Sequence, residues 1–233
     1  MEAIDTPQRA LVTIAHPDDA ESGCGGTVAR WVREGTEVFF VLCTDGRAGT
    51  SDVEMDPDRL AEIREQEQIE AARVLGVNEV VCLRHPDGAL AQSQALLGEL
   101  VHAIRQFRPD VVLSQAPHRL SSHQHQDHRA VGRVSQDACY PYARDPWHFP
   151  EHLREEGLET YKTGAILFWG DDDPDVFVDI TDTIDLKVLS LQKHASQMRS
   201  LGLGARVRGR TQEMGELAGC LYAEAFRRIS FRR

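Results

Sequence analysis

Short apolar runs alternate along this chain with longer segments whose apolar residues recur every three or four positions. The runs occupy residues 11–15, 38–43, 80–83 and 111–113. Continuous apolar runs of this length are typical of strands that are buried on both faces. The segments with helical spacing occupy residues 25–34, 57–75 and 94–107. This β-α-β-α order predicts an α/β fold with a Rossmann-like parallel sheet and helices on both of its faces.

The clearest helix signals surround the second helical segment. Asp56 can cap this helix, Pro57 suits its first position, and Gly76 suits its end. The inward stripe of the helix consists of Leu60, Ile63, Ala71 and Val74. Glu67 falls on the same stripe, and a carboxylate at such a position needs a partner. Arg64 lies one turn earlier on that face and is therefore the expected partner.

The pattern is less regular beyond residue 115. Alternation and apolar content predict two further strands, at residues 165–169 and 176–180. Helical spacing predicts two further helices, at residues 182–198 and 217–228. A stretch rich in proline and aromatic residues, at 140–150, is expected to be a surface loop.

The length and the absence of repeats predict one domain over residues 1–233. Its core is expected at residues 11–198, with an extension at 199–233. Residues 202–210 are expected to be the most mobile segment. The arginine-rich stretch at residues 206–233 is expected to form a solvated surface or a contact between subunits.

Polar residues cluster where the apolar runs end. His16, Asp18 and Asp19 follow the first run, Asp87 follows the third, and a histidine-rich segment at 118–128 follows the fourth. Ligands of such sheets bind beyond the carboxyl ends of the strands. An imidazole beside two adjacent carboxylates is a costly arrangement unless a cation neutralises the like charges. The clusters therefore predict a site for a divalent metal ion, and the protein is interpreted as a metal-dependent hydrolase.

The residues at these strand ends carry a family resemblance. The chain has Ala-His-Pro-Asp-Asp-Ala-Glu at 15–21, Thr-Asp-Gly at 44–46, Arg-x-x-Glu at 64–67 and His-x-Asp-His at 125–128. These motifs, in this order, resemble those of the PIG-L/LmbE deacetylases, over residues 11–198. The resemblance implies a Rossmann-like fold and the zinc-dependent removal of an N-acetyl group from an N-acetylglucosamine-like moiety.

The resemblance also implies roles for individual residues. His16, Asp19 and His128 match the zinc ligands, Asp18 matches the general base, and His125 matches the general acid. Two imidazoles and one carboxylate leave a coordination position open, so that bound water can be acidified and can attack a polarised carbonyl. Amide cleavage also needs a base for the proton of this water and an acid for the leaving nitrogen.

Three further positions follow from the same comparison of motifs. Arg64 and Asp87 match positions that resemble the family's sugar contacts. Some relatives have a tyrosine two residues before the acid histidine, where it assists the oxyanion, and this chain has His123 there. The resemblance therefore leaves open what assists the oxyanion besides zinc. Asp127 is expected to orient His125 or one of the ligand histidines.

Two other classes of function remain open. A non-haem iron oxygenase also uses two histidines and one carboxylate, so Fe²⁺ or another divalent metal ion is an alternative to zinc. Iron oxygenases of this class usually have a β-barrel fold and need no base such as Asp18. The second alternative is a sugar-binding or metal-storage protein without catalysis, in which Asp18 would affect only affinity.

Charge and composition narrow the range of partners. The formal net charge of −11 disfavours nucleic acid and anionic membranes and fits a neutral or cationic small substrate more easily. The resemblance implies that this substrate is an amino sugar, and a homo-oligomer is left open. The first five residues are acidic and polar where a secretory signal would be basic and apolar, and no run spans a bilayer. The expected location is therefore the cytoplasm. The five cysteines are spread without a C-x-x-C pair, which argues against disulfides and a thiolate zinc site.

Several other features have a structural interpretation. Gly23, Gly25 and Gly26 lack the spacing of a dinucleotide-binding turn and are expected to allow close packing. Residues 171–175 are rich in aspartate and are expected to form a solvated turn rather than a calcium loop. His85 ends a predicted strand and is a weaker candidate for substrate contact. The side chains left without an assigned role are Trp169, Tyr140, Arg144, Lys187, His194 and Gln197.

Overall fold

The computed structural model describes residues 4–121, 123–197 and 202–231. The strands in this part of the chain are β1 (Arg9–Ile14), β2 (Glu37–Thr44), β3 (Glu79–His85), β4 (Val111–Gln115), β5 (Ala165–Trp169), β6 (Val176–Asp179) and β7 (Ala223–Ser230). The helices are α1 (Asp19–Arg33), α2 (Pro57–Leu75), α3 (Gln94–Phe107), α4 (Gln126–Cys139), η1 (Tyr142–Arg144, a 3₁₀ helix), α5 (Pro150–Arg154), α6 (Ile184–Leu191) and α7 (Leu203–Ala218).

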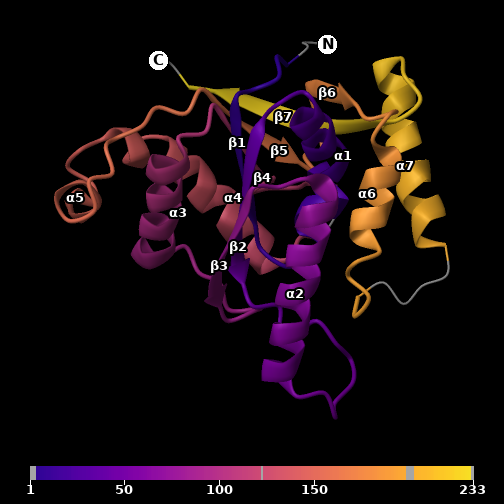
Figure 1. Cartoon of the computed structure of the whole chain (residues 1–233), viewed down its shortest axis with the longest axis horizontal. Helices are drawn as coiled ribbons and strands as arrows, with labels where there is room; N and C mark the ends of the chain where they lie inside the picture. Colours follow the sequence, from indigo (N-terminus) through magenta and orange to yellow (C-terminus); the bar gives the residue numbers. More distant parts are fainter. Residues whose placement is uncertain (1–3, 122, 198–201, 232–233) are drawn as a thin grey trace.

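The centre of the molecule is a seven-stranded sheet in the order β3-β2-β1-β4-β5-β7-β6. The five strands from β3 to β5 are parallel, as the sequence predicts. β7 runs antiparallel to both β5 and β6, so the sheet as a whole is mixed. α1, α2, α6 and α7 lie on one side of the sheet, and α3, α4 and α5 lie on the other (Figure 1).

Each face of the sheet has its own hydrophobic core, and β1 contributes to both. Val12 and Ile14 pack with α1 and α2, whereas Leu11 packs with α3 and α4. All three side chains are fully buried. This alternation follows from the two-residue period of a strand, and it explains why a strand covered on both faces is apolar at every position.

The first half of the chain follows its sequence signals closely. The Asp56 side chain accepts a hydrogen bond from the peptide N–H of Arg59, and Gly76 ends α2 with a φ of 80°. α1, however, begins at Asp19, six residues earlier than predicted. A Cβ at Gly23 would lie 2.4 Å from the Trp169 indole, so this glycine serves the close packing expected of it.

The later elements differ more from the prediction. The helix expected at residues 182–198 ends at Leu191, and residue 198 lies outside the described residues. Residues 203–218 form α7, so the segment expected to be mobile is mostly helical. The helix expected at residues 217–228 is wrong, because residues 223–228 belong to β7 inside the sheet and only 217 and 218 are helical, at the end of α7. β7 buries Ala223, Glu224 and Phe226, whereas the side chain of Arg227 remains 42% exposed, so the expected solvated or intersubunit surface stays a prediction for its arginines.

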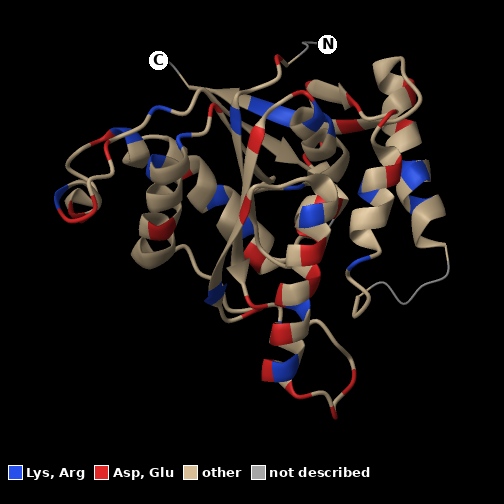
Figure 2. Cartoon of the chain, viewed as in Figure 1, with Lys and Arg blue, Asp and Glu red and all other residues tan. Residues whose placement is uncertain are grey.

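Most charged residues lie on helices and loops (Figure 2), and the strands β4 and β5 contain none. Acidic and basic residues alternate along α2, and acidic residues mark the loop that precedes it. Within the described ranges, no helix is both long enough and apolar enough to cross a membrane.

Candidate metal centre

The predicted metal ligands meet where the strand order of the sheet reverses. β1 lies between β2 and β4, so the chain leaves β1 toward one edge and later returns to its other side. His16 lies two residues beyond β1, and Asp19 is the first residue of α1. His128 lies in the first turn of α4, which follows β4. Crevices at such points are where open α/β sheets bind ligands.

The three residues offer a compact set of donor atoms. His16 Nδ1 lies 3.1 Å from His128 Nε2 and 3.6 Å from Asp19 Oδ2. His128 Nε2 lies 3.2 Å from Asp19 Oδ1. Ligand atoms around a tetrahedral zinc ion, at about 2.0–2.2 Å from it, are roughly 3.4 Å apart. The donor types and their spacing therefore fit one such ion.

The charges around these donors favour a cation. Burial acts to lower the pKa of His16, but Asp127, Asp19 and Asp87 outweigh it and raise this pKa to about 11. Burial acts to raise the pKa of Asp19, but the imidazoles of His128 and His16 hold this pKa far below its usual range. A divalent cation bound to the imidazole nitrogen would replace this proton, and its positive charge would stabilise the same carboxylates.

Two carboxylates hold the outer nitrogen of His16. His16 Nε2 lies 3.1 Å from Asp127 Oδ2 and 3.1 Å from Asp87 Oδ1. Asp127 is buried and accepts hydrogen bonds from the peptide N–H groups of Gly88 and Leu90, at 2.8 and 3.2 Å. A carboxylate in this position fixes the orientation of a metal-binding imidazole and makes it a stronger ligand.

Asp18 has a left-handed backbone, with a φ of 92°, and its carboxylate lies 3.7 Å from the Arg64 guanidinium. Its peptide N–H donates to Gln68 Oε1 at 3.1 Å, and Gln68 Nε2 donates to Glu21 Oε1 at 2.7 Å. Burial and the charge of Asp19 raise the pKa of Asp18 from 3.8 to about 7. Sequence reasoning missed Gln68, although it lies one turn after Arg64 on the same face of α2.

His125 lies beside the predicted ligands and caps α4. Its ring meets the His16 ring edge-on, with the ring centroids 4.7 Å apart. Its Nδ1 accepts a hydrogen bond from the peptide N–H of Asp127 at 3.2 Å, so the proton of the neutral ring is on Nε2. Burial and the charge of His16 lower the pKa of His125. The side chain is 48% exposed, which leaves it accessible to a substrate.

Arg64 and Asp87, the predicted sugar contacts, lie next to this centre. Arg64 is 4% exposed and donates to the carbonyl oxygens of Gly46 and Pro17, at 2.7 and 2.9 Å. Its guanidinium lies 3.7 Å from Asp18 and 3.9 Å from Asp87. Arg64 thus joins the turns that follow β1, β2 and β3.

The predicted pairing of Arg64 with Glu67 is wrong. Glu67 accepts hydrogen bonds from the peptide N–H and the hydroxyl of Ser196, at 2.8 and 2.6 Å. The long side chain of Arg64 instead crosses to loops that are distant in sequence. Helical spacing shows which side chains can be neighbours, but it does not show which tertiary partners compete for them.

A cavity of about 430 Å³ opens beside the metal ligands. Asp19 and His128 line it at the metal centre. Other walls come from the loop after β4, from β5 and from α7, and they include Gln115, Arg119, Trp169, Thr211 and Met214. The volume lies in the range of small-molecule sites. Trp169, Thr211 and Met214 of its walls lie far from the metal motifs in sequence.

Two side chains without an assigned role support the first turns of α1. Lys187 donates to the carbonyl oxygens of Glu21 and Ser22, at 2.9 and 2.7 Å, and to the carboxylate of Glu224. His194 Nε2 lies 3.3 Å from Glu21 Oε2. The sequence did not predict the role of Glu224, because its pattern indicated a helix at residues 217–228 where the structure has β7.

Two weaker candidates have other partners. His85 Nε2 lies 2.6 Å from Glu99 Oε2. Asp173 and Asp175 both pair with Arg227 on β7, at 3.1 and 3.6 Å. The aspartate-rich segment is thus a turn fastened to the sheet.

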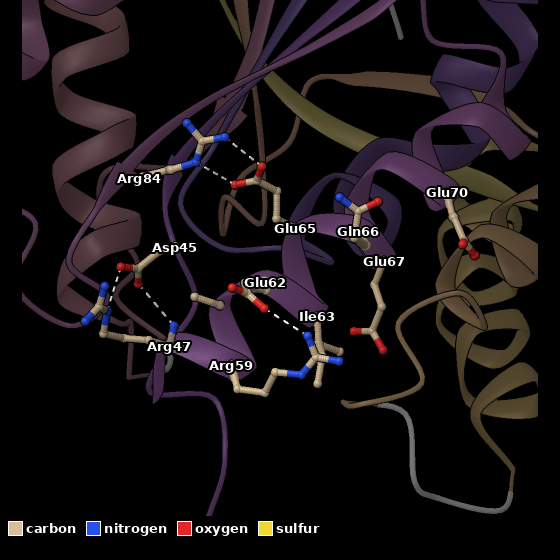
Figure 3. Close-up of a pocket in the computed structure, with 11 residues that line it drawn as sticks. Asp45, Arg47, Arg59, Glu62, Ile63, Glu65, Gln66, Glu67, Glu70 and Arg84 are labelled. Carbon is tan, nitrogen blue, oxygen red and sulfur yellow. Dashed lines mark hydrogen bonds and ion pairs between the residues drawn. The ribbon is translucent and has the colours of Figure 1, made fainter. Parts of the chain in front are cut away.

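A second cavity, of about 720 Å³, lies along α2, and none of the predicted metal ligands lines it. Its charged side chains pair with one another, as Figure 3 shows for Arg84 with Glu65 at 2.8 Å and for Arg47 with Asp45 at 2.7 Å. This groove carries no cluster of metal-binding groups among the described residues.

Comparisons with known proteins place this chain in a family of deacetylases. The family model described as "PIG-L: GlcNAc-PI de-N-acetylase" matches residues 11–139. The diacetylchitobiose deacetylase of Thermococcus kodakarensis is 33% identical over 84% of this chain and 72% of its own length. A 1D-myo-inositol 2-acetamido-2-deoxy-alpha-D-glucopyranoside deacetylase of Kineococcus radiotolerans is 28% identical over 89% of this chain and 73% of its own.

The structural similarity extends over nearly the whole chain. The N,N'-diacetylchitobiose deacetylase of Pyrococcus horikoshii superposes with a TM-score of 0.90 at 31% sequence identity. The match covers 96% of this chain and 84% of that enzyme. The mixed sheet, including β7, therefore lies within the region of similarity.

Proposed function

This chain belongs to the PIG-L family of GlcNAc-PI de-N-acetylases, and from this premise we propose that it removes the N-acetyl group from an N-acetylglucosamine-like sugar or its conjugate. The relatives make hydrolytic N-deacetylation the activity of the family to which the chain belongs. One observation carries the proposal for this site: His16, Asp19 and His128 converge at the switch point of the sheet.

We propose zinc as the metal ion held by His16, Asp19 and His128. Their two nitrogens and one carboxylate match catalytic zinc sites with three protein ligands. When bound, the ion supplies Lewis-acid polarisation of the amide carbonyl and acidifies water. Fe²⁺ or another divalent ion is the alternative, because the same donors bind several first-row metals. Metal analysis of the purified protein separates these cases.

Asp18 and His125 are the proposed base and acid. The Asp18 carboxylate accepts the proton of the attacking water, and its position beside Asp19 supports this role. His125 is proposed to act in its protonated, imidazolium form, in which it would donate the Nε2 proton to the leaving nitrogen and return to neutral imidazole. Each residue thus handles one of the two proton transfers that amide cleavage requires.

Arg64 and Asp87 are proposed to act on the substrate side of the same centre. Their burial and mutual contacts support a role in which they hold the turns around the sugar, in addition to any direct contact. Asp87 accepts from the peptide N–H of Ala48 at 3.1 Å and contacts His16. Substitution of either residue by Ala should lower kcat/KM on an N-acetylglucosaminyl substrate by about 10- to 100-fold.

The activity is tested by the release of free amine from N-acetylglucosamine and from N,N'-diacetylchitobiose. The purified protein is assayed as isolated, after dialysis against a chelator, and after zinc is restored. We expect activity in the first and third samples only, since the metal supplies part of the chemistry. Sugar binding without amine release in every sample would favour a non-catalytic sugar-binding protein.

Two groups of substitutions should separate metal binding from catalysis. His16→Ala, Asp19→Ala and His128→Ala should each lose tight zinc binding, because each removes one of three protein ligands. Asp18→Asn and His125→Ala should retain zinc and lose about 100-fold or more in kcat, because each removes one proton transfer. Elemental analysis and steady-state kinetics measure the two effects.

His85→Gln is the matched control, because this histidine also lies at the carboxyl end of a strand but pairs with Glu99. It should keep both zinc and turnover. Stoichiometric zinc in all three ligand variants after chelator dialysis would contradict the metal site. Turnover like that of the unmodified enzyme in Asp18→Asn would contradict the assignment of the base even if the metal site were correct.

A further inference from the structure

The side chain of Gln115 is buried without a hydrogen-bond partner. It is the last residue of β4 and is 1% exposed. Neither its Oε1 nor its Nε2 has a partner among the described residues. Most buried polar side chains are hydrogen-bonded, because an unpaired donor or acceptor loses its hydration without compensation. An amide with both ends unpaired therefore requires an explanation.

The strand places this amide at the cavity beside the metal centre. Ser114, the preceding residue, bonds with Ser135 of α4, so its side chain lies on the α4 face of the sheet. Successive side chains of a strand point to opposite faces, and Gln115 therefore points to the α1 face. There it lines the same cavity as Asp19 and His128.

Close backbone packing holds Gln115 and its neighbour in place. A Cβ at Gly132 of α4 would lie 2.3 Å from the Gln115 carbonyl oxygen, so helix and strand are in direct contact. Gln115 pairs in register with Trp169 of β5, whose indole packs over Gly23. Trp169 lines the cavity too. The unpaired amide is thus part of a rigid wall with an aromatic neighbour.

We propose that Gln115 is a substrate-binding residue whose carboxamide pairs with a hydroxyl group of the amino sugar and selects sugars that carry this hydroxyl. A carboxamide offers donors and an acceptor side by side, and a sugar hydroxyl offers both as well. The cavity of about 430 Å³ is far larger than an acetyl group, so it has room for the sugar itself. The inference rests on the proposed deacetylation of an amino sugar.

The test compares enzyme variants with deoxygenated substrates. The unmodified enzyme and Gln115→Leu are assayed with N-acetylglucosamine and with its 3-deoxy, 4-deoxy and 6-deoxy analogues. Gln115→Leu should lower kcat/KM on the parent sugar by about 10- to 100-fold, because a buried hydroxyl loses its partner. On one analogue the two enzymes should differ by less than about threefold, since the hydroxyl that the amide binds is then absent.

Equal losses on all four sugars would overturn the proposal, because Gln115 would then act on the protein or on the acetyl group rather than on a hydroxyl. No loss on any of them would also overturn it. Gln115→Met repeats the comparison with a side chain of different shape, so that a packing defect in one variant does not decide the result. Zinc content should be unchanged in both variants, because Gln115 is not among the proposed ligands.

Stability in the absence of sugar gives a second, independent measurement. Replacing the unpaired amide by an apolar side chain of similar volume should raise the urea midpoint of Gln115→Leu or Gln115→Met. Gln124→Met is the matched control, because the Gln124 amide is also buried but only its Oε1 has no partner among the described residues, while its Nε2 donates to the carbonyl oxygen of Ala116. Its midpoint should fall. A fall of the midpoint in both Gln115 variants would overturn the proposal.

The two proposals fail in different ways. If the unmodified enzyme releases no amine from any of the sugars, the proposed function fails. If it releases amine and Gln115→Leu shows the same preference among the four sugars, only the role of Gln115 fails.

Discussion

At the scale of the residue, two neighbouring carboxylates have different surroundings. Asp18 has a left-handed backbone and lies beside Arg64, whereas Asp19, the next residue, lies beside the two imidazoles. Burial raises the pKa of Asp18 to about 7, while His128 and His16 hold that of Asp19 far below its usual range despite burial. Neighbouring groups with such opposed pKa values are suited to different roles, and those proposed for Asp19 and Asp18 are metal binding and proton transfer.

A histidine far from the metal should control stability in mild acid. His152 is buried, and its Nδ1 lies 3.4 Å from Arg105 while its ring meets that of His102. Burial and these two neighbours lower its pKa below 6.5, against the opposing charges of Glu151 and Glu156. Below pH 6.5, His152 therefore binds a proton in the unfolded chain but not in the folded protein. The free energy of unfolding falls as the pH falls from 6.5 toward the lower pKa that His152 has in the folded protein.

Urea unfolding of the enzyme and of His152→Gln, each between pH 7.5 and 5.5, measures this effect. The midpoint should fall less steeply with decreasing pH in the variant, because the titrating group is absent. Above pH 7 the difference between the two proteins should not depend on pH. Parallel curves throughout the range would show that His152 does not contribute.

At the scale of the element, α4 brings the metal centre together. Its first turn carries both His128, a predicted ligand, and Asp127, which holds His16. The helix can approach β4 closely because residue 132 is glycine. The Cβ of any other residue there would lie 2.3 Å from the Gln115 carbonyl oxygen. Backbone atoms cannot yield as a flexible side chain can, so the position of α4 depends on this residue.

Two glycine substitutions in helices should therefore have opposite effects. Gly132→Ala should destabilise the protein by about 1–3 kcal/mol through overpacking and should weaken zinc binding, because α4 carries His128. Gly209→Ala lies in α7 with nothing within 4 Å of the added methyl, and should stabilise by about 0.5–1 kcal/mol. Denaturation and chelator competition measure the two effects. Equal behaviour of the two variants would refute this account of α4.

The elements also show which parts of the fold the sequence could predict. β1, β2 and β4 were recognisable because both their faces are buried, and α2 because its two ends carry local signals. β7 was predicted as a helix, because its residues 223–230 contain one β-branched residue and two arginines. Its pairing with β5 and β6 decides its conformation, and such pairing has no local signal.

The candidate site, too, could be predicted from the sequence only in part. The metal motifs could be found because their residues are close together in sequence within each motif. Gln68, Glu224 and the true partner of Glu67 could not be found, because each depends on contacts between distant segments. Gln115 has an ordinary sequence context, and only its burial without a partner distinguishes it.

At the scale of the whole molecule, a buried ion pair joins the two halves of the chain. Lys187 of α6 is 2% exposed and contacts both the start of α1 and Glu224 of β7. The Glu224 carboxylate also accepts from the peptide N–H groups of Gly26 and Thr27, at 3.0 and 2.7 Å. The late strand is thereby fastened to the helix that begins at the metal centre.

Lys187→Met should lower the free energy of unfolding by about 3–5 kcal/mol, because it leaves the Glu224 carboxylate buried without its counter-ion. Arg59→Met is the matched control: it breaks the ion pair with Glu62, in which both side chains are exposed, and should change stability little. Urea unfolding monitored by tryptophan fluorescence measures both. Similar midpoints for the two variants would contradict the structural importance of the buried pair.

The place of β7 in the sheet also bears on how the protein is made. β5 and β6 are close in sequence, yet β7 separates them in the sheet, and more than forty residues lie between β6 and β7. During translation, both strands therefore emerge from the ribosome before the strand that joins them. Until residues 223–230 are synthesised, each presents an unpaired edge, and such edges template aggregation. Protection by chaperones should thus matter most in the interval between the synthesis of β6 and that of β7.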